Sequence, residues 1–229
     1  MIESDMRIFF IHVYRRHWEF YPEDEVAALE SDAPEESGGF IRWVARSSAN
    51  AWRSVHEAET GVLGAIRRVI DRLNSRVDPT EPMLQRIRKA ETLDLTYPSG
   101  ISPQYARRRL RLLLLHKTSI HRRGIIINSL LIPLTAAMGV VPGPNVFLAW
   151  NGYRLLSHIN AWRGGQRVLT GQIPVTFTPS DELDELLSPE ERLIRPLDHS
   201  IAETIGDRFA LPGLVEYLKR TGSLVVDEP

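Results

Sequence analysis

The fold is decided by residues 124–162, which read Gly124-Ile-Ile-Ile-Asn-Ser-Leu-Leu-Ile-Pro-Leu-Thr-Ala-Ala-Met-Gly-Val-Val141, then Pro142-Gly-Pro-Asn145, then Val146-Phe-Leu-Ala-Trp-Asn-Gly-Tyr-Arg-Leu-Leu-Ser-His-Ile-Asn-Ala-Trp162. The first stretch has 18 residues and no charged side chain. Pro142 and Pro144 force a turn between the two apolar stretches. The pattern therefore predicts an antiparallel helical hairpin.

Two settings suit this hairpin. As a helix, residues 124–141 would be about 27 Å long, at the lower limit for a hydrocarbon core of about 30 Å. Pro133 in the first arm, and Arg154 and His158 in the second, are better tolerated against protein than against bare lipid. We expect the hairpin to dip into or span a bilayer. The alternative is a hairpin buried in the core of a soluble helical module, which periodicity alone does not separate.

Charge is distributed very unevenly along the chain. Residues 95–180 hold ten basic side chains and no Asp or Glu, whereas the remaining residues hold 18 basic and 29 acidic ones. A basic, apolar middle indicates an anionic partner, such as lipid head groups or nucleic acid. The absence of carboxylates also argues against a cation carrier, because carriers place such groups within their spans. His158 is the one side chain of the two arms that titrates near neutrality, and we expect it to be structural.

The hairpin supplies the candidate membrane-contact and structural residues. Its open ends are basic, which would keep both on one face of a membrane. Aromatic side chains of the second arm could lie at the interface, and Arg154 could extend its charge toward the head groups. The full set is Arg122, Arg123, Pro133, Pro142, Pro144, Asn145, Trp150, Tyr153, Arg154, His158, Trp162 and Arg163.

The residues before the hairpin predict a small β element and amphipathic helices. Aromatic and β-branched residues predict a strand over about 6–14, and alternation predicts a second at 93–97 that could pair with it. An acidic connector is expected over 21–39 and an amphipathic helix over 40–76. Thr80 can cap a further helix, and Ser102-Pro103 can begin a basic one that runs through His121 or beyond.

The residues after the hairpin predict one extended segment and short helices. Gly164-Gly165 is interpreted as a helix end, and residues 174–179 as extended. Ser180 precedes several acidic residues and can cap a helix, and helices over 200–209 and 213–220 are separated at Leu211-Pro212. We expect a mainly α fold with a small β element, in which long amphipathic helices surround a central apolar hairpin. We divide the chain into three segments. Residues 1–98 hold the strand, the acidic loop and amphipathic helices, residues 99–172 hold the basic helix and the apolar hairpin, and residues 173–229 form an acidic C-terminal helical segment.

Several of these motifs resemble the mitochondrial K+/H+ exchange-related family. The similarity rests on the basic segment ending His121-Arg122-Arg123, on Val140-Val141-Pro142-Gly-Pro144-Asn145, and on Tyr153-Arg154-Leu-Leu-Ser157-His158 with Ala161-Trp162. It is clear over about 97–187. The resemblance implies a membrane-associated protein connected with potassium and proton homeostasis, mitochondrial in eukaryotes. It implies no catalytic or ligand residues.

Catalytic and metal chemistry finds little support in the sequence. The chain has no Cys and no phosphate-binding, dinucleotide-binding or nucleophile-elbow motif. The pairs His12/His17 and His116/His121 are five residues apart, which separates their side chains around a helix. We therefore expect no metal, no cofactor and no enzymatic activity.

Nucleic acid is a weaker alternative partner. The Arg-rich helix over 104–123 could contact phosphates, but its run of leucines is unlike the polar face of a groove-binding helix. We favour anionic lipids, with a protein partner or a second copy also allowed. The expected role is that of a regulator or assembly factor for K+/H+ exchange rather than the carrier. It would act at a bacterial inner membrane or, in a eukaryote, the mitochondrial inner membrane, without a cleaved leader.

Overall fold

The computed structural model describes residues 5–23, 78–137 and 146–224. The expected helix over 40–76, most of the acidic connector and the turn containing Pro142, Pro144 and Asn145 lie outside these residues. Within them the chain is mainly helical with a small sheet, as the sequence predicts.

The sheet has four strands in the order β2-β1-β3-β4. They are β1 (Asp5–Tyr14), β2 (His17–Pro22), β3 (Thr92–Pro98) and β4 (Val175–Ser180). β1 and β2 form an antiparallel hairpin, and β1 pairs with β3, and β3 with β4, in parallel. The expected pairing of the first strand with residues 93–97 is confirmed, and the extended segment 174–179 corresponds to β4. The sheet joins strands from the segments 1–98 and 173–229.

Strand β2 corrects the interpretation of residues 21 and 22 as the start of a connector. Trp18 and Phe20 alternate with polar His17 and Glu19 and stack on Phe10 of β1, with ring centroids 4.4 and 4.6 Å apart. This burial of aromatic rings explains why the chain returns immediately after Tyr14 instead of entering a loop.

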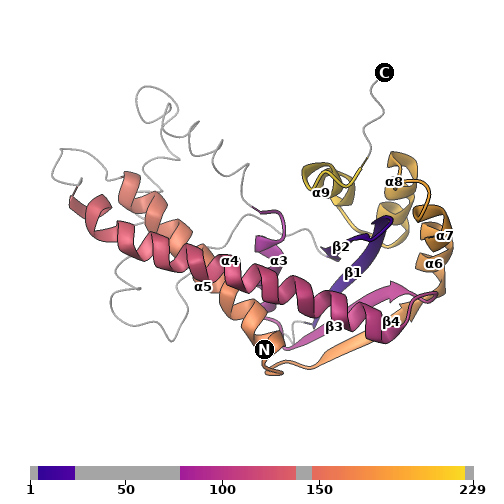
Figure 1. Ribbon diagram of the computed structural model, residues 1–229, viewed down its shortest axis with the longest axis horizontal. Helices are drawn as coiled ribbons and strands as arrows, with labels where there is room; N and C mark the ends of the chain where they lie inside the picture. The colour runs from indigo at the N-terminus through magenta and orange to yellow at the C-terminus, as the bar shows by residue number, and fades with distance from the viewer. Residues whose placement is uncertain (1–4, 24–77, 138–145, 225–229) are drawn as a thin grey trace, which may run out of the picture.

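Alternate residues of β1 enter two different cores. Ile8 and Phe10 pack against one set of helices, which are α3 (Glu81–Ile87), α4 (Pro103–Ala137) and α5 (Val146–Leu169). Phe9 and Ile11 pack on the opposite face against α6 (Asp181–Leu187), α8 (His199–Arg208) and α9 (Leu214–Arg220). Figure 1 shows these two helical layers with the sheet between them; the short α7 (Pro189–Arg192) follows α6.

Helix α4 is a single helix of 35 residues that contains Pro133. It begins as predicted, with Ser102 Oγ accepting a hydrogen bond from the amide of Tyr105. The predicted basic helix and the first apolar arm are therefore one continuous element. Its first part, including Ala106, Leu110 and Leu114, covers the sheet, and the rest extends beyond it beside α5 (Figure 1).

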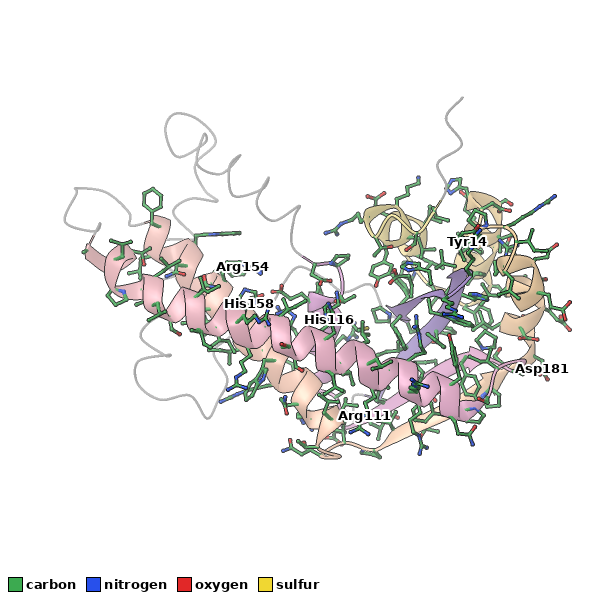
Figure 2. All side chains as sticks on the ribbon, viewed as in Figure 1. Tyr14, Arg111, His116, Arg154, His158 and Asp181 are labelled. Atoms are coloured by element: carbon green, nitrogen blue, oxygen red, sulfur yellow. The ribbon has the colours of Figure 1, made fainter. Side chains whose placement is uncertain are left out.

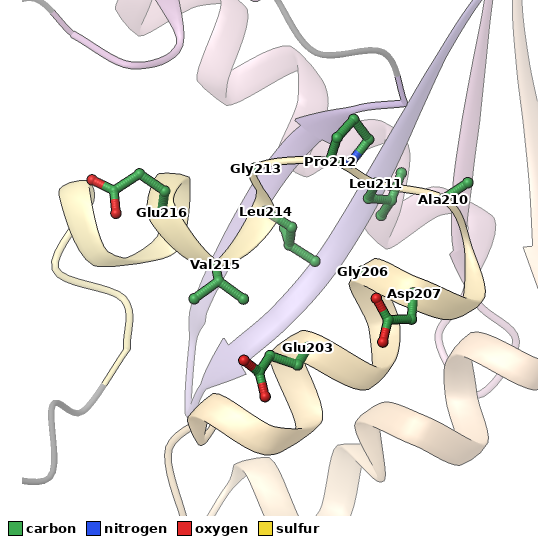
Figure 3. A pocket seen from close by; sticks show the side chains of 10 residues that line it. All are labelled: Glu203, Gly206, Asp207, Ala210, Leu211, Pro212, Gly213, Leu214, Val215 and Glu216. Carbon is green, nitrogen blue, oxygen red and sulfur yellow. The ribbon is translucent and has the colours of Figure 1, made fainter.

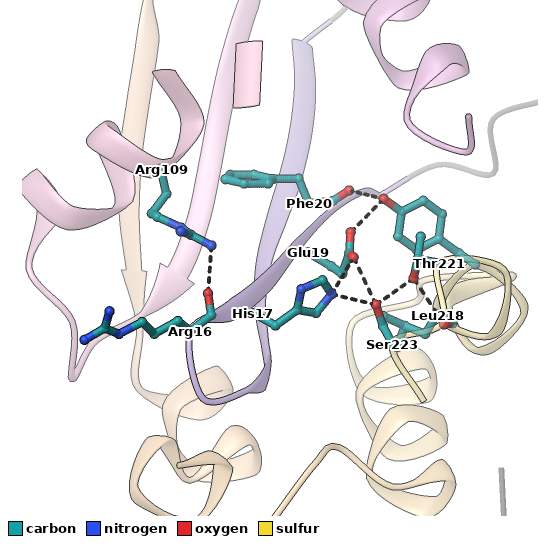
Figure 4. Close-up of polar contacts among 9 residues, drawn as sticks. Arg16, His17, Glu19, Phe20, Arg109, Leu218, Thr221 and Ser223 are labelled. Atoms are coloured by element: carbon teal, nitrogen blue, oxygen red, sulfur yellow. Dashed lines mark hydrogen bonds and ion pairs between the residues drawn. The ribbon is translucent and has the colours of Figure 1, made fainter. Parts of the chain in front are cut away.

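The C-terminal helices follow the sequence prediction closely. Ser180 caps α6 by accepting a hydrogen bond from Leu183, and the break at Leu211-Pro212 separates α8 from α9. A polar network ties α9 to β2, in which Tyr217 and Ser223 both donate to the carboxylate of Glu19 (Figure 4). In the same view Arg109 of α4 donates to the carbonyl of Arg16 at 2.9 Å.

Candidate functional site

The residues expected to contact a membrane lie in different surroundings. Those on α4 are exposed, namely Arg122, Arg123 and Pro133. Those on α5 are buried or partly buried, namely Trp150, Tyr153, Arg154, His158, Trp162 and Arg163. Most of the α5 residues therefore face protein, and two of them, Arg154 and His158, belong to a polar cluster that joins three helices.

An ion pair between α3 and α5 forms the centre of this cluster. Arg154 Nη1 and Nη2 donate to Glu81 Oε1 and Oε2 at 2.9 and 3.1 Å. The side chains are 13% and 1% exposed. A bidentate pair of this kind is strong and geometrically specific, and a buried charge needs such a partner. The expectation that Arg154 extends to lipid head groups is thus corrected, since its partner is a protein carboxylate.

Helix α3 contributes more than the carboxylate. Ser157 on α5 donates its hydroxyl proton to Glu81, and Gln85, one turn along α3, donates to Ser157 Oγ at 2.7 Å. Both side chains are buried. Arg154 and Ser157 of α5 therefore both find hydrogen-bond partners on α3.

The cluster continues to α4 through two histidines. Arg154 Nη2 donates to His158 Nε2 at 3.3 Å, and the Nδ1 atoms of His158 and His121 are 2.9 Å apart. His121 Nε2 is buried and has no hydrogen-bond partner among the described residues. His158 is thus not the lone histidine that the sequence suggests, because His121 reaches it from the other helix. Figure 2 shows Arg154 and His158 on α5 where it runs beside α4.

Burial keeps both imidazoles neutral. It lowers the pKa of His158 to about 4, with a further contribution from the charge of Arg154. Burial also lowers the pKa of His121, although the charges of Glu81 and Asp78 act in the opposite direction. Neutral imidazoles keep a lone pair free to accept a proton, a hydrogen bond or a metal ion.

Glycines let the three helices approach closely enough for these contacts. A Cβ at Gly164 of α5 would overlap the carbonyl oxygen of Leu84 in α3, and a Cβ at Gly124 of α4 would lie 2.5 Å from the ring of His158. The interpretation of Gly164-Gly165 as a helix end is therefore wrong. These residues lie inside α5, where the absence of a side chain allows α3 to pack against it.

A second feature of the α4–α5 pair is an apolar end beyond the cluster. We define it by large apolar side chains that are at least 41% exposed, which are Ile126, Ile127, Leu130, Leu131, Leu134 and Phe147. Leu130 is 74% exposed, and only a small core, built on Ile132, Leu155 and Ile159, lies inside this end. In the described parts of the chain, no helix has both the length and the hydropathy required to cross a bilayer.

The comparison with protein families decides the affiliation. A model described as mitochondrial K+-H+ exchange-related matches residues 7–170. The chain belongs to this family. No curated protein and no solved structure is similar to the chain. The match begins near the N-terminus, where the opening Met6-Arg-Ile-Phe-Phe-Ile also resembles the family, and it ends at residue 170, short of the 187 expected from the sequence. It includes every helix of the polar cluster and both helices of the apolar end.

For this K+-H+ exchange-related chain, sequence reasoning missed Glu81, Gln85 and His121 as partners of the second arm. The signal was faint: Glu81 and Gln85 are four residues apart and share one face of a short helix, as do Arg154 and His158. Nothing in their spacing shows that the two faces meet.

The described residues also form a hollow of about 720 Å³ between α8 and α9, outside the matched range. Figure 3 shows that the carboxylates of Glu203, Asp207 and Glu216 line it together with apolar side chains. Its lining has no basic, imidazole or hydroxyl group that could bind or attack a substrate. The polar cluster and the apolar end are therefore the stronger candidates for function.

Proposed function

We propose that this protein is a non-enzymatic, membrane-associated regulator or assembly factor for K+/H+ exchange, and that the apolar end of the α4–α5 pair attaches it to an anionic bilayer. The exposed side chains of that end carry the proposal. Burying one Leu or Ile side chain is worth about 1.5–3 kcal/mol, so partial insertion of several gives stable attachment. The ends of α4 at Ala137 and of α5 at Val146 would enter first, and the opposite ends of the two helices would stay on one face.

Charge supports a lipid partner over an apolar protein surface. Arg122 and Arg123 are exposed on α4 immediately before the apolar end, and neither arm contains an acidic residue. Each basic residue near anionic head groups contributes about 1 kcal/mol. The polar cluster lies level with these arginines, because His121 directly precedes Arg122 and the ring of His158 lies against Gly124. The proposed insertion therefore ends where the cluster begins.

The same structure favours a regulator over a carrier. Glu81 is a carboxylate that contacts the second arm, and Arg154 and Ser157 already occupy its oxygens. A transported K+ ion would have to displace both of these groups to reach the carboxylate. Within the described residues, the pair therefore offers no ready path for K+.

Flotation of the purified full chain with vesicles tests the attachment. The chain should float with vesicles of phosphatidylcholine and phosphatidylglycerol and remain bound in high salt, because insertion is not screened. Leu130→Lys combined with Leu134→Lys should release it. The matched control is Ile194→Lys, since Ile194 is 79% exposed on the opposite side of the sheet. Retention of the double variant, or binding to duplex DNA alone, would refute the proposal.

A flux assay tests the regulatory role. Membranes that contain the native exchanger should show altered K+-driven proton flux when the chain is added, and vesicles that contain the chain alone should show none. Flux through the chain alone would make it a carrier, contrary to the proposal.

A further inference from the structure

Three potential metal ligands meet where α3, α4 and α5 pack together. Glu81, His121 and His158 each offer a ligand atom, and these atoms all lie within 4.8 Å of one another. We propose that they form a binding site for a divalent transition-metal ion of the zinc type. Two imidazoles and one carboxylate are the protein ligands of three-ligand zinc sites, in which the fourth position is left to water.

The donor spacing is close to what such an ion requires. At Zn–N and Zn–O distances of about 2.0–2.1 Å, tetrahedral ligand atoms lie about 3.3 Å apart. The two histidine Nδ1 atoms are already 2.9 Å apart. The three ligand atoms lie no more than 4.8 Å apart, so movements of up to about 1.5 Å would bring the carboxylate to the same spacing.

The histidines are in the protonation state that metal binding needs. Arg154 donates to His158 Nε2, so the proton of neutral His158 resides on Nδ1 and is donated to Nδ1 of His121. The proton of His121 then resides on Nε2, which is buried with no partner among the described residues. A metal ion held by the two Nδ1 atoms would take the place of this proton. The proton would move to Nε2 of His158, so that both rings bind as neutral imidazoles, and Arg154 would first have to leave that nitrogen.

Arg154 is the competitor for this site. Its guanidinium occupies the carboxylate oxygens of Glu81 that the metal would need and the His158 Nε2 atom to which the proton of that ring would move, and its charge opposes a second cation. Lys117 opposes the cation as well, whereas Asp78, which forms an ion pair with Lys117, favours it. The Arg154 side chain is 13% exposed, so it has a route toward solvent. Metal binding would therefore exchange one cation for another at the same carboxylate.

The packing around His158 is consistent with a formed site. Gly124 lets the backbone of α4 lie against the ring, since a Cβ there would lie 2.5 Å from Cδ2 and Nε2. The ligands come from three helices, so the ion would join them. This inference is independent of membrane attachment, because the apolar end shares no residue with the cluster.

Cobalt is the probe for this site because its absorption reports coordination geometry. We expect the purified full chain to bind one equivalent of Co²⁺ with the intense visible bands of four-coordinate cobalt, and Zn²⁺ to displace it. His121→Gln and His158→Gln should each weaken binding by at least about tenfold. The matched control is His116→Gln, an exposed histidine one turn away on α4, which should leave binding unchanged.

A second variant keeps the test decisive if a histidine variant does not fold. Arg154→Met removes the competing cation and should raise Co²⁺ affinity by at least about tenfold, and Zn²⁺ should raise its melting temperature more than that of the unaltered chain. The proposal is overturned if neither protein binds Co²⁺, if the spectrum is octahedral, or if His116→Gln lowers affinity as much as His121→Gln. Vesicle flotation of the same variants should be unchanged.

Discussion

Arg154 of α5 and Glu81 of α3 are 73 residues apart in sequence and form a bidentate ion pair in the interior of the protein. The pair connects the N-terminal part of the fold to the second arm of the hairpin. It also explains how a charge is tolerated in an otherwise apolar helix, since the carboxylate comes from outside the acid-free stretch.

Breaking this pair should destabilise the protein. Glu81→Gln leaves the guanidinium of Arg154 without its counter-charge, at a cost of about 3 kcal/mol or more. Urea denaturation followed by circular dichroism measures the loss. Glu182→Gln is the control, because its pair with Arg208 is exposed and should contribute little. The double variant Glu81→Leu/Arg154→Met should recover most of the stability; if it is no better than Glu81→Gln, the isolated charge is not the cause.

A methyl group at Gly164 should separate α3 from α5. Gly164→Ala places a Cβ on the carbonyl oxygen of Leu84, and the resulting displacement should cost about 2 kcal/mol or more. Gly206→Ala in α8 is the matched control, because its nearest atom would be 3.6 Å away. Removing that helical glycine should be neutral or stabilising by up to about 1 kcal/mol. Equal effects in denaturation experiments would contradict the close packing of the two helices.

Stability should decrease on mild acidification. The pKa of His158 falls from 6.5 to about 4 on folding, so below pH 6.5 the unfolded chain binds more protons than the folded one. The contribution is fully present above pH 6.5 and is lost as the pH falls toward 4; His121 shifts in the same direction. Urea denaturation at a series of pH values should show this slope. It should be shallower in His158→Gln and unchanged in His116→Gln, and an unaltered slope in both would refute the assignment.

The two arginines before the apolar end should contribute to membrane affinity through charge. Arg122→Gln and Arg123→Gln should each weaken binding to phosphatidylglycerol-containing vesicles about fivefold, which corresponds to about 1 kcal/mol. Binding to uncharged vesicles should not change. Arg220→Gln, at an exposed position of α9, is the control. A loss that persists in high salt would show that these residues act by packing rather than by charge.

Local signals in the sequence predict much of the fold. Ser102-Pro103 and Ser180 mark helix starts correctly, because a cap depends on neighbours in the chain. Strand β2 was missed because its evidence is the stacking of Trp18 and Phe20 on Phe10 of another strand. The aromatic residues of β2 are few and are followed directly by acidic residues, so the alternation of apolar and polar side chains is too short to predict a strand.

The candidate site was less predictable than the fold. Arg154 and His158 were identified from the second arm, but their partners Glu81 and His121 come from helices whose packing depends on long-range contacts. Counting residues within one helix excludes a metal-binding pair at 116 and 121, yet it carries no information on a pair formed between 121 and 158. Gly164 and Gly124 are compatible with close packing of helices, but the sequence does not show that α3 packs on Gly164 or that the ring of His158 packs on Gly124.

The continuity of α4 has a mechanical consequence. Its 35 residues form a rod about 52 Å long, with one end lying on the sheet and the other carrying Leu130 and Leu134. A tilt of about 5° at the sheet would swing the far tip by about 5 Å. The helix thus acts as a lever arm. If the depth of its tip in a bilayer changed, the helix would tilt and rotate relative to the strands on which its other end lies.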